Sequence, residues 1–130
     1  MWGAGLLISP ALRQGQVEVE AYFPKARWYD YYSGAELPSS GRNITLPTPI
    51  DKINLHVRGG HVIPWQREAN TTVISRQNSM GLIVGLDDVG QASGSLFWDD
   101  GESFGEFPLA RSVGQAIDLV YEHVDSKAYL

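Results

Sequence analysis

The chain contains 130 residues, of which 43% are hydrophobic and 19% charged, and it carries a formal net charge of −5. This composition is typical of a folded globular protein and excludes an intrinsically disordered one. Because there is no excess of basic residues to replace phosphate counterions, we predict no nucleic-acid partner. The complete absence of cysteine excludes disulfides, thiolate metal ligands and cysteine nucleophiles.

No apolar run approaches the length that is needed to cross a bilayer, so the sequence predicts no transmembrane segment. The first residues lack a basic stretch followed by a long apolar one, and we therefore expect no signal peptide in this chain. Two N-x-T sequons, at Asn43 and Asn70, are candidate N-glycosylation sites. Their use would require passage through the secretory pathway.

The first half of the chain alternates between short strand patterns and turns. In the second of these patterns, Val17, Val19, Ala21 and Phe23 fall on one face at a period of two residues. The expected strands cover residues 6–10, 17–23, 27–32 and 43–46.

Residues 50–64 hold two strand patterns on either side of Gly59-Gly60, and we expect them to form a hairpin that closes the first module. The first strand of this pair has an apolar face, predicted to join the core, and a polar face, predicted to lie at the surface or between domains. The apolar face carries Ile53, Leu55 and Val57, and the polar face carries Asn54, His56 and Arg58.

From Trp65 to Asn78 the sequence is polar and has no periodic pattern, which indicates a boundary between two β-modules. Apolar strands are expected at residues 80–86 and 94–98, joined as a hairpin by a turn at Asp87 to Gly90. Residues 111–122 fit a strand or a helix, and we favour the strand for consistency with the rest. Short strands separated by turns predict an all-β, antiparallel β-sandwich fold.

Few residues suggest a catalytic or metal site. Asp99 and Asp100 could serve in acid–base chemistry on a glycoside or hold a cation, but a turn in which they bind their own backbone is favoured. His56, His61 and His123 do not have a spacing that converges on one point, so we predict no metal site and no cofactor. No serine lies in a nucleophile pattern.

Aromatic side chains are candidates for stacking on a sugar ring. Trp28 is predicted to lie in the core, whereas Tyr29 and Tyr31 fall on the opposite face of the same strand and are candidate sugar contacts. Trp65 is a third candidate. These residues support an alternative interpretation of the chain as a stand-alone carbohydrate-binding or adhesion β-sandwich.

Five motifs, in the same order and at the same spacing, resemble the C-terminal region of glycoside hydrolase family 31. The likeness covers residues 1–104 and is greatest to the animal α-glucosidase group of lysosomal acid α-glucosidase, maltase-glucoamylase and sucrase-isomaltase. The motifs are Trp2-Gly3 with Leu6-Leu7-Ile8-Ser9-Pro10, Ala21-Tyr22-Phe23-Pro24 with Trp28-Tyr29-Asp30, Leu46-Pro47 with Ile50-Asp51-Lys52-Ile53, Arg58-Gly59-Gly60-His61-Val62-Ile63-Pro64, and Leu96-Phe97-Trp98-Asp99-Asp100-Gly101-Glu102.

The resemblance implies a (β/α)₈ barrel that is followed by a proximal and a distal C-terminal β-sandwich. The expected divisions are a junction strand at residues 1–10, the proximal sandwich at 11–66, a linker at 67–78, and the first part of the distal sandwich at 79–130. The residues expected to be buried between barrel and sandwich are Trp2, Leu6, Leu7 and Ile8.

The resemblance also implies that this chain holds no catalytic residue. The family's nucleophile lies in a Trp-x-Asp-Met-Asn-Glu motif on a barrel loop, and that motif does not occur here. We therefore expect a non-catalytic part of a retaining α-glucosidase, which braces the parent's barrel, meets the α-glucan substrate only through the parent and is inactive alone. The implied location is the secretory pathway, as a lysosomal or an extracellular, brush-border protein.

Overall fold

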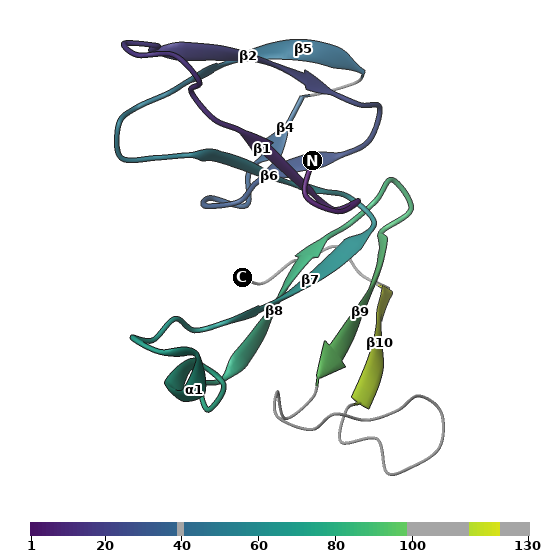
Figure 1. Ribbon diagram of the computed structural model, residues 1–130. Helices are drawn as coiled ribbons and strands as arrows, with labels where there is room; N and C mark the ends of the chain where they lie inside the picture. Colours follow the sequence, from purple (N-terminus) through teal and green to yellow (C-terminus); the bar gives the residue numbers. More distant parts are fainter. Residues whose placement is uncertain (39–40, 99–114, 123–130) are drawn as a thin grey trace.

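The computed structural model describes residues 1–38 and 41–98, together with the backbone of residues 115–122. Strands make up almost all of the regular structure in this part of the chain, and the helix within it has four residues (Figure 1). The predicted all-β class is confirmed. In chain order the elements are β1 (Leu6–Ser9), β2 (Glu18–Phe23), β3 (Trp28–Asp30), β4 (Glu36–Leu37), β5 (Arg42–Pro47), β6 (Asn54–Arg58), β7 (His61–Gln66), α1 (Thr72–Ser75), β8 (Met80–Gly85), β9 (Gln91–Trp98) and β10 (Gln115–Glu122).

The first six strands form a β-sandwich. One sheet has the order β1-β6-β3-β4, the other pairs β2 with β5, and the pairings are antiparallel. In Figure 1, β2 and β5 form one layer, and β1 and β6 lie in the layer beneath it. The chain therefore crosses repeatedly between the two layers, and a core forms where their inner faces meet.

The core of the sandwich is centred on Phe23 and Trp28, which are both fully buried. Their rings meet edge to face, with centroids 5.5 Å apart. The indole Nε1 of Trp28 donates a hydrogen bond of 2.9 Å to the carbonyl oxygen of Pro24, so its polar atom is satisfied. The predicted core position of Trp28 is confirmed, as is the shared inward face of Ala21 and Phe23. Val17, predicted on the same face, is 74% exposed because β2 begins only at Glu18. The buried cluster is completed by Leu7, Ala21 and Leu46.

The prediction for the two faces of β6 is wrong. Asn54 and His56 are buried on the core side of the strand, and Leu55 lies half-buried on the opposite side. The polar side chains are accommodated because Asn54 Nδ2 donates to the Pro47 carbonyl oxygen at 2.8 Å and the His56 ring meets Phe23 edge to face at 4.9 Å. The alternation itself is right, but a period of two does not say which face is the core face.

The hairpin predicted at residues 50–64 is also wrong. β6 pairs with β1 and β3, whereas β7 pairs with β8 and β9. Gly60 has a φ of 84°, and a Cβ on Gly59 would lie 2.6 Å from the carbonyl oxygen of Leu86. The glycine pair therefore carries the chain from one sheet to the next through a close backbone approach, which only glycine permits.

The second sheet has the order β10-β9-β7-β8. The hairpin expected between residues 80–86 and 94–98 is wrong in its pairing, because β7 lies between β8 and β9. The turn between them is confirmed, since Asp87 Oδ1 accepts hydrogen bonds from the amides of Val89 and Gln91 at 3.0 and 2.9 Å. The preferred strand within residues 111–122 is confirmed over β10.

The segments expected to be a junction strand and a linker both contain regular structure. β1 pairs with β6 and contributes Leu7 to the core, so it is an integral strand of the sandwich. α1 lies within the polar stretch expected to be a linker, and Thr71 caps it by accepting a hydrogen bond from the Ile74 amide. The described residues include no helix with the length and apolar character that a membrane span requires.

Candidate functional site

The first candidate surface is the side of the β1-β6-β3-β4 sheet that faces away from the core, which we call the outer face. Cross-strand pairing places Leu6 with Val57 and Ile8 with Leu55 on this side. Val57 is buried there, and a Cβ on Gly85 of β8 would approach its side chain to 3.1 Å. Leu6, Ile8 and Leu55 are half-buried. The second sheet therefore covers one end of the outer face and leaves an aliphatic remainder.

The four residues predicted to pack against a barrel divide between two sides of β1. Leu6 and Ile8 lie on the outer face, but Leu7 points into the core because side chains alternate along a strand. Trp2 is 74% exposed, and its amide donates a hydrogen bond of 2.7 Å to the carbonyl oxygen of Leu6. Leu7 is thus buried in the core of this chain, whereas Trp2, Leu6 and Ile8 are accessible to a partner.

Tyr29, a predicted sugar contact, instead joins the sandwich to the second sheet. Its hydroxyl donates a hydrogen bond of 2.7 Å to the Leu86 carbonyl oxygen, and burial raises the pKa of Tyr29. Arg27 lies over the Tyr29 ring at 5.4 Å and donates to the Asp87 carbonyl oxygen at 3.1 Å. Arg27 also binds both carboxylate oxygens of Glu36, at 3.0 and 2.6 Å, which lowers the pKa of Glu36.

Tyr31, the second predicted sugar contact, lies in a turn that Asp30 holds. Asp30 Oδ1 accepts hydrogen bonds from the amides of Tyr32 and Ser33 at 3.1 and 2.9 Å. Burial alone would raise the pKa of Asp30, but hydrogen bonds from Ser33 and Lys52 lower it. Tyr31 is 38% exposed and meets Tyr32 edge to face at 5.2 Å, while Lys52 Nζ lies 4.7 Å from the centre of the Tyr32 ring.

Trp65, the third predicted sugar contact, lies on β7 beside an open pocket of about 340 Å³. The pocket is formed by three segments, namely the end of β7, the residues after α1 and the start of β8. Gln66 Nε2 donates to the Asn78 carbonyl oxygen at 2.9 Å, and Asn78 Nδ2 donates to the Arg67 carbonyl oxygen at 3.0 Å, which ties these segments together. The lining residues are Trp65, Arg67, Gln77, Asn78, Ser79 and Met80.

This pocket could not be predicted from the sequence. Gln77 and Asn78 belong to a polar stretch without periodicity, and only the lone aromatic Trp65 marked the region as a candidate. The structure does not gather the three aromatic candidates into one site. Tyr29 is in the joint between the sheets, Tyr31 is in the turn after β3, and Trp65 is on β7.

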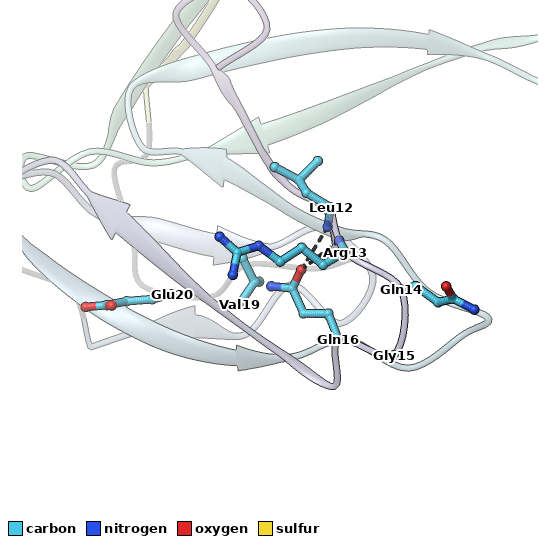
Figure 2. A pocket seen from close by; sticks show the side chains of 7 residues that line it. All are labelled: Leu12, Arg13, Gln14, Gly15, Gln16, Val19 and Glu20. Atoms are coloured by element: carbon cyan, nitrogen blue, oxygen red, sulfur yellow. Dashed lines mark hydrogen bonds between the residues drawn. The ribbon is translucent and has the colours of Figure 1, made fainter.

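A larger open pocket of about 460 Å³ lies over the loop between β1 and β2 (Figure 2). Its central side chain is Gln16, whose Oε1 accepts from the amides of Leu12 and Arg13 at 2.9 and 3.2 Å and whose Nε2 donates to the Glu18 carbonyl oxygen. Figure 2 shows Gln14 pointing away from the other lining residues. The polar groups of Gln16 are therefore used to hold the loop in place rather than to meet a ligand.

Among the described residues, no group of three or more His, Asp or Glu side chains is placed to hold a metal ion. His56 is buried, its Nδ1 has no hydrogen-bond partner in this part of the chain, and burial lowers the pKa of His56. His61 is half-buried, with Nδ1 3.1 Å from the Gly59 carbonyl oxygen. His123 and the Asp99-Asp100 pair lie outside the described residues.

Both sequon asparagines are exposed. Asn70 lies just before α1, on the segment that leads from β7. Asn43 lies on β5, and its Nδ2 donates a hydrogen bond of 2.8 Å to Glu20 Oε1. Since an N-linked glycan is attached to this nitrogen, modification of Asn43 would have to disturb that hydrogen bond, whereas the structure describes no such bond for Asn70.

Residues 1–63 match the family described as glycosyl hydrolase family 31 C-terminal domain. The chain is 56% identical over 103 residues to the human protein "Probable maltase-glucoamylase 2", which covers 79% of this chain and 4% of that protein. It is 53% identical over 103 residues to rat intestinal sucrase-isomaltase, covering 79% and 6% of the two chains. Bovine lysosomal alpha-glucosidase is 45% identical over 120 residues, covering 81% of this chain and 13% of that protein.

Solved structures agree with this assignment. The crystal structure of the Tris-bound glucosidase II alpha subunit superposes with a TM-score of 0.80 at 26% identity, over 91% of this chain and 13% of that chain. The chain thus spans only 4% to 13% of the length of these similar proteins. Sequence and structure together show that the chain belongs to glycosyl hydrolase family 31, of which it carries C-terminal-domain sequence.

Proposed function

We propose that the chain is a non-catalytic brace within a larger α-glucosidase. Its parent hydrolyses terminal α-glucosidic bonds with retention, and the sandwich packs against the parent's catalytic barrel. The names of the similar proteins, maltase-glucoamylase, sucrase-isomaltase and lysosomal alpha-glucosidase, support this substrate class. The chain spans a small fraction of each, so an α-glucan is met only through the parent.

The observation that carries this proposal is the aliphatic remainder of the outer face. Leu6, Ile8 and Leu55 are half-buried without any contribution to the core, which lies on the other side of their sheet. Completing the burial of such a side chain stabilises an interface by on the order of 1 kcal/mol. Trp2 is 74% exposed and lies next to this surface in the chain, so it adds an aromatic contact at the edge.

A chimera tests the brace. Residues 1–104 of this chain would replace the matching segment of full-length rat sucrase-isomaltase, and the yield of folded, active enzyme would be measured. We expect the chimera to be active and the substitutions Ile8→Lys and Leu55→Lys to lower its yield at least several-fold, because each places a charge in the interface. Leu12→Lys is the matched control, since Leu12 is 83% exposed on a loop. Equal yields from all three variants would contradict the brace.

The isolated chain provides a second test. We expect it not to hydrolyse an aryl α-glucoside, and to self-associate through its uncovered apolar surface. Turnover well above the blank that is lost in Asp99→Asn would refute the non-catalytic role.

We further propose that the parent passes through the secretory pathway, towards the lysosome or the brush border. The names of the lysosomal and intestinal relatives support this, as do the exposed sequons at Asn43 and Asn70. For the domain division, we place the boundary between the proximal and distal regions at Gly59-Gly60, where the strand partners change. This boundary precedes the linker that the sequence pattern predicts at residues 67–78.

A further inference from the structure

We propose that Trp65 and the polar side chains around it form a binding site for an α-linked gluco-oligosaccharide. The choice of sugar rests on the proposed function of the parent, but the site itself rests on the geometry of β7 and β8. It is a site for recognition, with no bond made or broken.

The indole of Trp65 packs against a glycine on the neighbouring strand. Trp65 pairs directly with Gly81 across β7 and β8. A Cβ on Gly81 would lie 2.4, 2.6 and 2.9 Å from Nε1, Cε2 and Cζ2 of Trp65. These three atoms adjoin one another on one edge of the indole, so this part of the ring packs closely against the glycine. Gly81 therefore makes room for the ring, and any larger residue would displace it.

The rest of the Trp65 ring is open to solvent. Trp65 remains 44% exposed although part of its ring packs against Gly81, so the indole is held by the sheet and still open to solvent. An exposed, rigid aromatic surface matches the flat C–H face of a pyranose. Because the strand pairing already holds the indole in place, the side chain loses little conformational entropy when a sugar binds. An aromatic side chain that covers a glycine can serve only to stabilise the strand pair. That purely structural role does not explain the pocket beside the Trp65 ring.

Hydrogen-bonding groups line the rim of the pocket. The Asn78 side chain is used to hold the Arg67 and Glu68 carbonyl oxygens, which fixes the loop after α1. Within the described residues, Trp65 Nε1, the side-chain amide of Gln77 and the Ser79 hydroxyl have no hydrogen-bond partner of their own. An indole donor, an amide that both donates and accepts, and a hydroxyl suit the hydroxyl groups of a sugar.

The experiment is a titration of the 130-residue chain with maltotetraose, followed through its tryptophan indole N–H signals in heteronuclear NMR spectra. We expect one indole signal, that of Trp65, to shift and saturate. Trp65→Ala should weaken binding at least about tenfold through loss of stacking, and Gln77→Ala about fivefold through loss of one hydrogen bond. Trp65→Phe should retain most of the affinity. Trp2→Ala is the control, because Trp2 is exposed and lies on the other module.

The possible outcomes separate this proposal from the brace. Absence of a saturable shift, or equal affinity of wild type and Gln77→Ala, overturns the sugar site, even if Trp65→Ala should fail to fold. Equal binding of cellotetraose overturns the α-linked ligand class. The chimera described above reports on the brace through its yield, so a loss of sugar binding with normal yield leaves the brace intact. A poor chimera with normal sugar binding refutes the brace alone.

Discussion

We expect acid to destabilise the sandwich through His56. The imidazole is 2% exposed, and its Nδ1 has no hydrogen-bond partner among the described residues. It faces Leu7 of β1 and Asp30 of β3 across the sheet and Phe23 of β2 across the core. Burial lowers the pKa of His56; the Asp30 carboxylate opposes this effect, and the Lys52 ammonium adds to it. The folded state therefore favours the neutral ring.

The sign and size of the effect follow from proton linkage. In the unfolded chain the pKa of a histidine is about 6.5, and in the fold the pKa of His56 is lower. Between these two values the unfolded state binds one more proton, so the free energy of unfolding falls by up to about 1.4 kcal/mol for each unit of decreasing pH. Above about pH 6.5 the term is constant. The lowered pKa values of Asp30 and Glu36 stabilise the fold above their unfolded values, and this stability is lost only below about pH 4.

The assay is urea denaturation of the full chain at intervals between pH 8 and pH 5. His56→Phe keeps an aromatic ring beside Phe23 and removes the titrating group, so its stability should stay nearly constant over the interval in which the wild type loses stability. His56→Leu serves as a second variant if the larger ring does not fit. His61→Gln is the control, and it should retain the wild-type dependence. If wild type and both His56 variants lose the same stability between pH 6.5 and 5, the reasoning about this buried ring is refuted.

Three further predictions concern the core, the joint and the surface. Phe23→Ala should lower the free energy of unfolding by about 3–5 kcal/mol in denaturant titrations, whereas Val17→Ala, at a position 74% exposed, should change it by less than about 0.5 kcal/mol. Tyr29→Phe should lower it by about 1 kcal/mol, because the Leu86 carbonyl oxygen loses its hydrogen bond; an equal loss in Tyr22→Phe would argue against the joint. Expressed in secretory cells, the chain should lose mass on glycosidase treatment, and Asn70→Gln should remove more of this shift than Asn43→Gln.

The core-facing side of β2 was predicted correctly within the strand, because its two faces differ clearly in chemistry. On β2 the alternation of Ala21 and Phe23 with charged and polar neighbours leaves only one core face. On β6 the same alternation led to the wrong choice of core face. Asn54 and His56 can be buried in the core because Pro47 and Phe23 provide partners for them. Hydrophobicity alone cannot anticipate such partners, because they come from other strands of the fold.

The candidate sites were harder to predict than the fold. Tyr29 lies on the predicted side of its strand, but β3 ends at Asp30 and Tyr31 lies in the turn that follows. The sequence also does not show that the Tyr29 hydroxyl would donate a hydrogen bond to the Leu86 carbonyl oxygen or that Tyr32 would flank Tyr31. Trp65 could be named as an aromatic outside the core pattern. Its value as a platform depends on Gly81 lying directly opposite, and that register is a tertiary property.

Both proposed surfaces follow from the change of sheet at Gly59-Gly60. Because β7 leaves β6 there, Gly85 of β8 comes to lie over Val57, and the outer face is open only from Leu55 onwards. The same departure places β7 beside β8, which brings Trp65 over Gly81. Had residues 50–64 formed the predicted hairpin, β7 would have continued the first sheet, and neither the partial cover nor the indole platform would exist. A substitution such as Gly59→Ala, which forces the Leu86 carbonyl oxygen away, should therefore disturb both surfaces together.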